Sequence, residues 1–333
     1  MSSALSHRYR EYQVNHDINP RHFDTAAIRV IEQIEAAGYD AFLVGGCLRD
    51  AIAGIKPKDF DIATNATPEQ LVKAIPKSRL IGRRFKIVHV RRGREILEVT
   101  TFRGHSSSGE KESKTGRLLR DNNFGNIVED AERRDFTINA LYYHPASNTL
   151  LDFVGGANDI KAKRISIIGK AEKRYQEDPV RMIRALRFSA KLGFNLDSET
   201  ASAIKPCAHF LGDIPAARMF DEVLKLLMSG AGVGTFALLR EYQLFRHLFP
   251  ACDALLETDN YQEKFVIQAL KNTDHRLKIG KYVTPAYLYA CMMWPAKHKA
   301  QETLIANGTP VHEAQRISTM GTLDQQVQCT AIP

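Results

Sequence analysis

The chain has 333 residues, of which 44% are hydrophobic and 25% charged, and it carries a formal net charge of +8. This composition is typical of a globular protein and argues against wholesale disorder, a collagen-like repeat and a membrane architecture. A usual domain size of about 150 residues predicts two domains or one domain with a helical extension. Residues 73–134 hold 16 Lys and Arg against 8 Asp and Glu. All of the excess charge lies there, and it predicts a polyanionic partner such as nucleic acid or an acidic membrane.

The cysteines indicate a reducing compartment. The five are odd in number and far apart, and none forms a C-x-x-C pair, which argues against both a disulfide framework and a zinc site. Residues 1–15 have no apolar core of the signal-peptide type, and the most apolar late stretch, 286–294, is too short to span a bilayer. We therefore expect a cytoplasmic protein with no membrane span.

The first part of the chain is predicted to mix helices and strands. Residues 1–22 lack periodicity, and we expect a flexible leader there. Asp24 is placed to cap a helix that ends at Gly38, and short strands follow at 41–44 and 59–63.

The next stretch continues the mixed pattern. Thr67 and Gln70 have the spacing of a capping box at the start of a helix, and residues 87–99 predict a hairpin with Gly93 at its tip. Residues 104–116 contain no apolar side chain and predict a mobile surface loop.

Helical patterns dominate beyond residue 171, for example over 179–191, 216–228 and 236–242. The change predicts a head of helices and strands followed by an all-helical region.

Two aspartates on the 59–63 strand carry the first chemical signal. Side chains alternate along a strand, so Asp59 and Asp61, with Cα atoms about 6.6 Å apart, point to one face. Two carboxylates so placed can share two divalent ions, as two-metal phosphoryl transfer requires, and Mg²⁺ favours carboxylate and phosphate oxygens. The turn at Gly45 and Gly46 lets a phosphate approach the backbone, and Arg49 can add a charged fork. The alternative is a solvated strand face, because D-x-D alone is a weak motif.

Several blocks resemble one family in the right order. The stretch at residues 43–71, LVGGCLRDAIAGIKPKDFDIATNATPEQL, resembles the signature of the class II nucleotidyltransferases. This group contains the tRNA CCA-adding enzymes and the bacterial poly(A) polymerases. Its R-R-D-F-T-I-N-A and E-D-x-x-R motifs resemble residues 132–143, ERRDFTINALYY, and 177–194, EDPVRMIRALRFSAKLGF. The poly(A) polymerase version, rather than the CCA-adding one, resembles residues 80–90, LIGRRFKIVHV, and 117–136, RLLRDNNFGNIVEDAERRDF.

The resemblance implies an α+β fold with three parts after the flexible leader. A catalytic nucleotidyltransferase head of the polymerase beta-like type, with a small mixed sheet, is expected over 23–170, and a helical neck that recognises the nucleotide base over 171–235. A helical body that binds RNA is expected over 236–333. Because the family's bacterial poly(A) polymerases carry further helices and a basic tail, we expect this body to be truncated and its RNA binding to be weak and strongly salt-sensitive.

The resemblance also assigns roles to acidic residues. Asp59 and Asp61 match the metal-binding carboxylates, and Asp135 matches a motif aspartate at the active site, so the predicted catalytic residues are Asp59, Asp61 and Asp135. Glu98 is a rival for the third acidic position, and the alternative is an ordinary solvent-facing strand residue.

Basic and polar residues complete the predicted site. The predicted nucleotide-binding residues are Gly45, Gly46, Arg49, Arg133, Arg134, Asp178, Arg181 and Arg184. Arg133 and Arg134 would neutralise the triphosphate, with an ion pair to Glu129 or Asp130 as the alternative. Asp178 and Arg181, three residues apart on one helix, would read the edge of a base, with an intrahelical ion pair as the alternative.

A basic stretch beside the head strands is predicted to bind RNA, with a solvated basic hairpin as the alternative. Its residues are Arg83, Arg84, Lys86, Arg91 and Arg92. Tyr142 and Tyr143 are candidates for stacking on bases, although core packing is expected for at least one of them.

Together these features predict a template-independent enzyme that adds AMP from ATP to RNA 3′ ends and releases pyrophosphate. Its cofactors would be two Mg²⁺ ions, with Mn²⁺ as a substitute, and its partners ATP and the RNA 3′ end. We expect a monomer that meets RNA-degradation or RNA-binding proteins. The alternatives are a tRNA CCA-adding enzyme and, from another class, a non-catalytic RNA-binding protein. A dinucleotide-dependent oxidoreductase is excluded, because no G-x-G-x-x-G is present.

Overall fold

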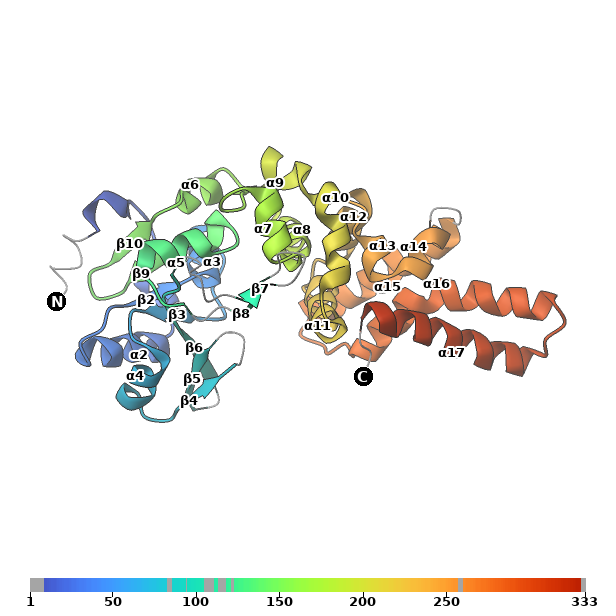
Figure 1. Cartoon of the computed structure of the whole chain (residues 1–333), viewed down its shortest axis with the longest axis horizontal. Coiled ribbons are helices and arrows are strands. Elements are labelled where there is room, and N and C mark those ends of the chain that lie inside the picture. Colours follow the sequence, from blue (N-terminus) through green and yellow to red (C-terminus); the bar gives the residue numbers. More distant parts are fainter. Residues whose placement is uncertain are drawn as a thin grey trace. The chain divides into compact units, whose positions relative to one another are not determined.

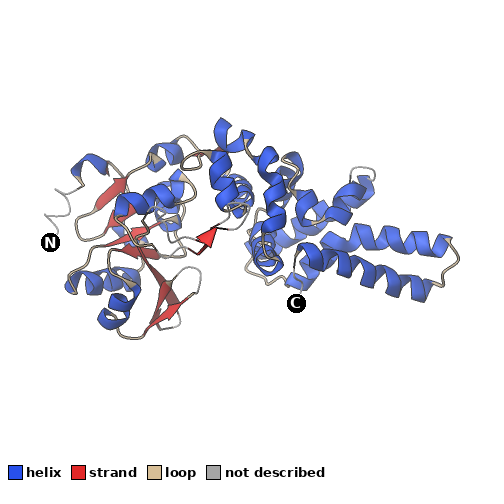
Figure 2. Ribbon diagram, viewed as in Figure 1, coloured by secondary structure: helices blue, strands red, loops and turns tan. Residues whose placement is uncertain are grey.

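The computed structural model describes residues 9–330 apart from 83–85, 94, 105–110, 113–117, 121–122 and 257–259. The chain divides into two compact units, Met1–Glu177 and Asp178–Pro333. Strands and helices mix in the first unit, whereas the second is almost entirely helical (Figure 2). Most of the predicted 104–116 loop lies outside the described residues.

The first unit is built on an eight-stranded mixed sheet (Figure 1). Its strands run in the order β1 (Gln13–Val14), β10 (Thr149–Asp152), β9 (Leu141–His144), β2 (Ala41–Val44), β3 (Asp61–Thr64), β6 (Glu95–Thr101), β5 (Ile87–Arg92) and β4 (Ser78–Ile81). The pair β3 and β6 is parallel, and the other neighbours are antiparallel. This confirms the predicted α+β head with a mixed sheet.

Helices and short strands surround this sheet. They are η1 (Arg10–Tyr12), η2 (Pro20–His22), α2 (Thr25–Ala36), α3 (Gly46–Ile52), α4 (Pro68–Ala74), β7 (Lys111–Glu112), β8 (Leu118–Arg120), α5 (Ile127–Arg133), η3 (Thr137–Asn139), α6 (Gly156–Lys161), β11 (Arg164–Ile165) and α7 (Ala171–Glu177). The core includes Phe42 and Tyr142 from the sheet and Ile127 from α5, all at most 2% exposed.

The predicted flexible leader is wrong for residues 9–22. Gln13 and Val14 form β1 and pair with Leu151 and Leu150, so the segment extends the sheet at one edge. The ring of Tyr12 lies 4.6 Å from that of Phe153, which anchors the segment further. A strand of two residues is too short to show a hydrophobic period, and this explains why the sequence pattern does not reveal it.

Local sequence signals produce the predicted starts and ends of the first helices. The Asp24 side chain accepts a hydrogen bond from the Ala26 N–H and caps α2, and Gly38 with φ +92° follows the end of that helix. Thr67 and Gln70 form the predicted capping box of α4. The hairpin of β5 and β6 also forms as predicted, and Gly93 turns between the strands with φ +62°.

The second unit contains the two-residue strand β12 (Asn195–Leu196) and a series of helices. The helices are α8 (Val180–Leu192), α9 (Ser198–Ser202), α10 (Ile204–Cys207), η4 (Ala208–Asp213), α11 (Ala216–Leu227), α12 (Gly232–Glu241), α13 (Phe245–Leu248), α14 (Pro250–Leu256), α15 (Asn260–Lys278), α16 (Pro285–Ala306) and α17 (Val311–Cys329). Within the described part of the chain, no single helix has the length and apolarity to cross a membrane, and only α11 and α12, bent by 118° at their junction, pass such a test as a pair.

Candidate active site

Two neighbouring strands bring three acidic side chains to one cavity. The parallel pairing of β3 with β6 places Asp61 beside Glu98, and Asp59 precedes β3 by two residues. All three line a cavity of about 590 Å³. The other lining residues are Asp24, Lys58, Phe60, Glu95, Ile96 and Leu97. The predicted strand over 59–63 therefore begins two residues late, yet both aspartates reach the same cavity.

The surroundings of Asp61 disfavour its charge. Desolvation and the negative charge of Glu98 raise the pKa of Asp61, the charge of Arg134 opposes this, and Asp59 raises it further. Carboxylates that raise one another's pKa attract a cation that can be shared between them. The cavity is thus an anionic recess.

The carboxylates suit a hard divalent ion, since Mg²⁺ binds carboxylate oxygens and completes its shell with water and substrate phosphates. Among the described residues, no group of three or more His, Cys, Asp or Glu is already arranged to hold a metal ion. Asp59, Asp61 and Glu98 therefore offer ligands that fit Mg²⁺ only together with oxygens from outside the protein.

His89 on β5 is the cross-strand neighbour of Glu98. Its Nε2 lies 3.4 Å from the Glu98 Oε1. The hairpin register gives this contact, so the signal was present in the sequence once the strand pairing was assigned.

Gly45 directly follows β2 and lies close to Asp61, which lines the cavity. Its φ of +78° and ψ of −133° suit only glycine. A Cβ built there would lie 3.8 Å from Asp61 Oδ2 and 3.8 Å from Arg134 Nη1. Gly45 thus lies between a carboxylate and a guanidinium. The neighbouring Gly46 would place a Cβ 3.4 Å from Arg49 Nη2.

Arg49 is 5% exposed and bound within the protein. Its Nε and Nη2 donate to Asp50 Oδ1 at 2.9 and 2.7 Å, and its Nη1 donates to Asn139 Oδ1 at 2.8 Å. In this geometry the guanidinium joins α3 to η3. Asn139 lies 90 residues away in sequence, so the residue pattern around Arg49 contains no sign of this contact.

Asp135 lies next to the contact between Arg49 and Asn139. Its Oδ1 accepts hydrogen bonds from the Phe136 N–H at 2.8 Å and from Asn139 Nδ2 at 3.1 Å. It is not among the residues that line the acidic cavity. The structure therefore brings Glu98, rather than Asp135, into the cavity with Asp59 and Asp61.

Arg134 adopts the ion pair that was the alternative to phosphate binding. Its Nη2 lies 3.0 Å from Asp130 Oδ2, its Nε donates to the Tyr142 hydroxyl at 2.9 Å, and that hydroxyl donates to Asp130 Oδ2 at 2.5 Å. Desolvation acts to lower the pKa of Arg134, but Tyr142 and Asp130 raise it above its usual range. Burial raises the pKa of Tyr142 well above its usual value. Tyr142 therefore serves the core and this polar triad.

Hydrogen bonds to backbone carbonyl oxygens hold Arg133 and Arg134 in place. Arg133 Nη1 donates to the carbonyl oxygen of Gly104. Arg174 on α7, which the sequence analysis missed, donates from Nη2 to the carbonyl oxygens of both Arg133 and Arg134 at 2.6 Å. Tyr143 is fully buried, and its hydroxyl donates to Asn148 Oδ1 at 2.7 Å, so both tyrosines of the motif are core residues.

The second unit holds the residues predicted to read the base. Helix α8 begins at Val180, so Asp178 precedes it and does not share its face with Arg181. Asp178 Oδ2 instead lies 2.8 Å from Nη2 of Arg218 on α11, a partner that the sequence analysis missed. The Cζ of Arg184 lies 5.5 Å from the centre of the Phe188 ring.

The predicted RNA-binding residues are only partly described, because Arg83 and Arg84 lie outside the described residues. Lys86 Nζ lies 2.8 Å from Glu69 Oε1 in an exposed ion pair. Arg91 Nε donates to the Gly93 carbonyl oxygen at 3.4 Å, and Arg92 Nη2 donates to Gln33.

Comparison with known families agrees with this geometry. The family model "Poly A polymerase head domain" matches residues 41–166, and the model "Probable RNA and SrmB- binding site of polymerase A" matches residues 193–256. Solved structures of similar fold include a CCA-adding enzyme from Bacillus stearothermophilus in complex with CTP, at 26% identity and a TM-score of 0.57, covering 90% of this chain and 82% of that one. A tRNA nucleotidyltransferase with a primer tRNA and an ATP analogue, at 23% identity, has a TM-score of 0.64 over 90% of this chain and 86% of that one.

Sequence relatives separate the two branches of the family. Poly(A) polymerase I of Salmonella typhi is 46% identical over 96% of this chain and 70% of its own length, and that of Haemophilus influenzae is 44% identical over 95% and 72%. The CCA-adding enzyme of Bacillus cytotoxicus is 37% identical over 66% of this chain and 54% of its own length. The predicted family is therefore confirmed: the chain is a nucleotidyltransferase that belongs to the poly(A) polymerase family.

Proposed function

We propose that this enzyme adds AMP from ATP to RNA 3′ ends without a template and releases pyrophosphate. The observation that carries the proposal is the cavity in which Asp59, Asp61 and Glu98 meet, in a chain 46% identical to poly(A) polymerase I over 96% of its length. Enzymes of this family generally use divalent metal ions. Two Mg²⁺ ions, which Mn²⁺ could replace, would here lower the pKa of the attacking 3′ hydroxyl and neutralise the triphosphate.

The protein's own part is to hold and orient these groups. We assign Asp59 and Asp61 to the metal ions, with Glu98 as the third carboxylate. Gly45 leaves room for a phosphate near Asp61, because it has no Cβ between that carboxylate and Arg134. Nε and Nη2 of Arg134 are bound to Asp130 and Tyr142, and its Nη1, near the same point, would face the triphosphate.

Asp135 would act through its neighbours. By accepting a hydrogen bond from Asn139 Nδ2, it orients the amide whose oxygen accepts from Arg49. We propose that Asp135 is a positioning residue, required for activity because it fixes the segment between α3 and η3.

Base selection is assigned to the second unit. Asp178, Arg181 and Arg184 offer an acceptor and planar donor groups, which an enzyme without a template needs for reading the base. The contact of Asp178 Oδ2 with Arg218 Nη2 holds the acceptor in place. Lys86, Arg91 and Arg92 would attract RNA phosphates, and with them Arg83 and Arg84.

An extension assay on one defined RNA, with each nucleotide supplied separately, tests the function. We expect long products with ATP alone and no extension by Asp61→Ala. A product limited to CCA would instead identify a CCA-adding enzyme, and undiminished incorporation by Asp61→Ala would overturn the metal assignment. The cytoplasmic location, the monomeric state and contacts with RNA-degradation or RNA-binding proteins remain predictions.

A further inference from the structure

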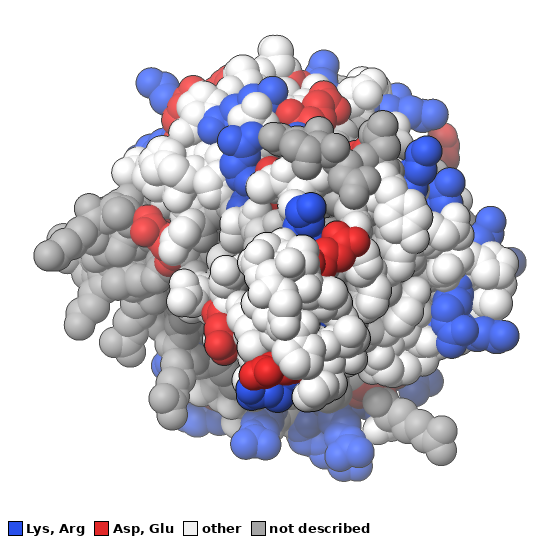
Figure 3. Space-filling model, turned by 90° about the vertical axis from the view of Figure 1, so that its right-hand side faces the viewer, with Lys and Arg blue, Asp and Glu red and all other residues white. Residues whose placement is uncertain are grey.

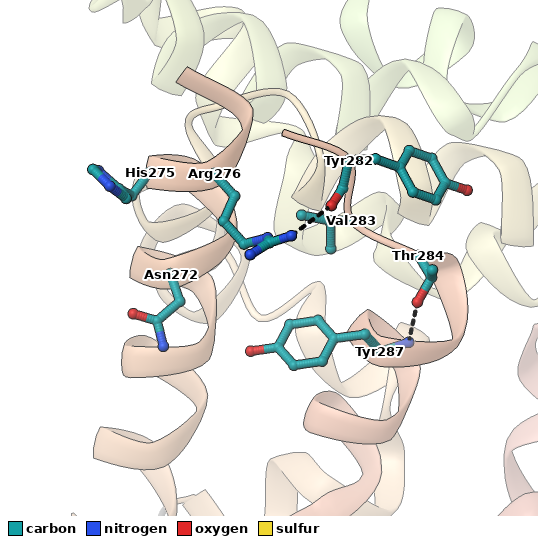
Figure 4. A pocket seen from close by; sticks show the side chains of 7 residues that line it. All are labelled: Asn272, His275, Arg276, Tyr282, Val283, Thr284 and Tyr287. Atoms are coloured by element: carbon teal, nitrogen blue, oxygen red, sulfur yellow. Dashed lines mark hydrogen bonds between the residues drawn. The ribbon is translucent and has the colours of Figure 1, made fainter. Parts of the chain in front are cut away.

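A second cavity lies within the helical unit, between the end of α15 and the start of α16 (Figure 4). Its volume of about 570 Å³ falls within the range of about 300 to 1,000 Å³ that small-molecule sites occupy. The lining residues are Asn272, His275, Arg276, Tyr282, Val283, Thr284 and Tyr287. These lie outside residues 193–256, which the RNA-binding family model matches.

Two side chains from opposite walls point into this space. Figure 4 shows the Arg276 guanidinium and the Tyr287 ring entering it from α15 and α16, while the ring of Tyr282 turns away. Arg276 Nη2 donates to the Tyr282 carbonyl oxygen at 3.2 Å, which fixes its direction. The Tyr287 N–H donates to Thr284 Oγ1 at 3.2 Å, which fixes the first turn of α16.

The Tyr287 ring lies partly buried among groups from both helices. Burial raises the pKa of Tyr287, Cys291 raises it further, and Arg276 and Asn272 oppose the shift. The side chain is nevertheless 41% exposed, so part of the ring remains open to a ligand. An oriented aromatic face, a guanidinium plane and an amide thus surround one cavity.

The charge around the cavity favours an anionic ligand. Residues 271–287, which include all the lining residues, contain four Lys and Arg, and Asp274 is the only acidic residue in this range. The Asp274 carboxylate accepts hydrogen bonds from the backbone N–H groups of Gly232 and Val233 at 2.8 and 3.1 Å, so it is directed at the start of α12. Figure 3 shows Lys and Arg along much of the rim of one face, with Asp and Glu among them.

We propose that this cavity binds one unpaired nucleobase of a single-stranded RNA, with the base stacked on Tyr287 and Arg276 and its edge facing Asn272. Single-stranded RNA is bound in this way, because bases stack on aromatic rings and guanidinium planes while their edges accept and donate hydrogen bonds. The proposal rests on the proposed function, which makes RNA the substrate. An acidic peptide would use the charge but not the aromatic face, so we favour RNA.

Fluorescence anisotropy of a labelled 15-nucleotide single-stranded RNA, with the full chain and without ATP, measures this site. Tyr287→Leu and Arg276→Gln should each weaken RNA binding by about tenfold, as expected for the loss of one stacked base. The matched controls are Tyr261→Leu, an exposed tyrosine on α15, and Lys299→Gln, an exposed lysine on α16, and both should bind RNA like the wild type. Equal affinities for all four variants would overturn the proposal.

A second measurement does not depend on a variant that folds. RNA carrying a single 5-iodouridine, crosslinked to the wild-type protein by light, should attach to Tyr287 or to another lining residue between 272 and 287. Crosslinks found only elsewhere in the chain would overturn the proposal. Displacement of the RNA by polyglutamate at equal concentration would identify an acidic-peptide site instead.

AMP incorporation separates this site from the proposed function. For Tyr287→Leu and Arg276→Gln we expect a KM for RNA raised about tenfold and an unchanged kcat, because the chemistry takes place in the other unit. If the wild type adds AMP but the variants match the controls, the cavity proposal fails and the function stands. If RNA binding depends on the cavity but no AMP is added, the function fails and the cavity proposal stands.

Discussion

Asp61 on β3 and Glu98 on β6 are partners in the parallel pair of the sheet, 37 residues apart in sequence. Their side chains line one cavity, and desolvation, followed by the charge of Glu98, raises the pKa of Asp61. This pairing, together with Asp59, defines the anionic recess on which the proposed chemistry depends.

Removing either carboxylate should therefore reduce AMP incorporation strongly. Asp61→Asn and Glu98→Gln keep the size of each side chain and remove its charge, and we expect losses in kcat of about a hundredfold or more, since a group at the centre of the chemistry usually contributes that much. Steady-state incorporation at saturating Mg²⁺ checks this, with Glu32→Gln on the exposed side of α2 as the control. If Glu98→Gln keeps the wild-type kcat, Glu98 is an ordinary strand residue and takes no part in the chemistry.

The Asp61 carboxylate should lower the stability of the folded protein in the absence of metal. A raised pKa means that the folded protein binds the Asp61 proton more tightly than the unfolded chain does. The stabilisation that this proton gives is therefore fully present below the ordinary carboxyl pKa of about 4 and is lost as pH rises. Asp61→Asn should therefore raise Tm at pH 7 in a chelating buffer, and the difference should shrink toward pH 4.

Adding Mg²⁺ provides the complementary measurement. The ion should raise the Tm of the wild type more than that of Asp61→Asn, because binding to the folded state stabilises it. A lower Tm for Asp61→Asn at pH 7 without metal would contradict the repulsion among the three carboxylates.

The buried triad of Arg134, Asp130 and Tyr142 predicts a stability effect of another kind. Tyr142→Phe removes a hydroxyl that donates to Asp130 and accepts from Arg134, so two charged groups lose a partner. We expect the free energy of unfolding to fall by about 1 to 3 kcal/mol. Urea unfolding measures this. The Tyr143 hydroxyl donates to the neutral amide of Asn148, so Tyr143→Phe should lower the free energy of unfolding by less.

Gly45 should be irreplaceable for both backbone and chemical reasons. Gly45→Ala must hold φ +78°, at a cost of about 1 to 3 kcal/mol, and its Cβ would lie between Asp61 and Arg134. Gly54→Ala is the matched control, because φ is +73° there and a Cβ would meet no atom within 4 Å. Both variants should lose stability in thermal unfolding, whereas only Gly45→Ala should raise the KM for ATP. Equal KM values would show that Gly45 serves the fold alone.

Local signals predicted much of this fold, and long-range contacts account for what they missed. The caps at Asp24 and Thr67 and the hairpin around Gly93 depend on residues close in sequence, so their patterns are readable. The choice between Glu98 and Asp135 as the third carboxylate depends on the parallel pairing of β3 with β6, which no local pattern encodes.

The predicted roles of the cations were limited in the same way. Arg49 has the motif position of a phosphate ligand, but its partner Asn139 comes from η3, 90 residues later. Asp178 has helical spacing from Arg181, but the helix begins two residues after it. A charged residue's partners are set by tertiary structure, so sequence supplies the candidates and not their contacts.

The pair of Asp178 and Arg218 gives the last prediction. Asp178 Oδ2 lies 2.8 Å from Arg218 Nη2, and Nη1 of Arg218 is buried with no hydrogen-bond partner among the described residues. If Asp178 reads the base, Arg218 determines where its carboxylate stands. Arg218→Met keeps the length of the side chain and removes that constraint, so the KM for ATP should rise about tenfold, equivalent to one hydrogen bond of about 1.4 kcal/mol, and the preference for ATP over CTP should narrow.

A purely structural role would give a different pattern. Arg246→Met removes an arginine that lies 3.9 Å from Asp253 at the surface, and it should leave nucleotide preference unchanged. Arg218→Lys should recover part of the ATP preference, because it restores a cation near Asp178 without the planar fork. If Arg218→Met lowers Tm but leaves the ratio of kcat/KM for ATP and CTP at its wild-type value, Asp178 supports the fold of the second unit and the base is read by other residues.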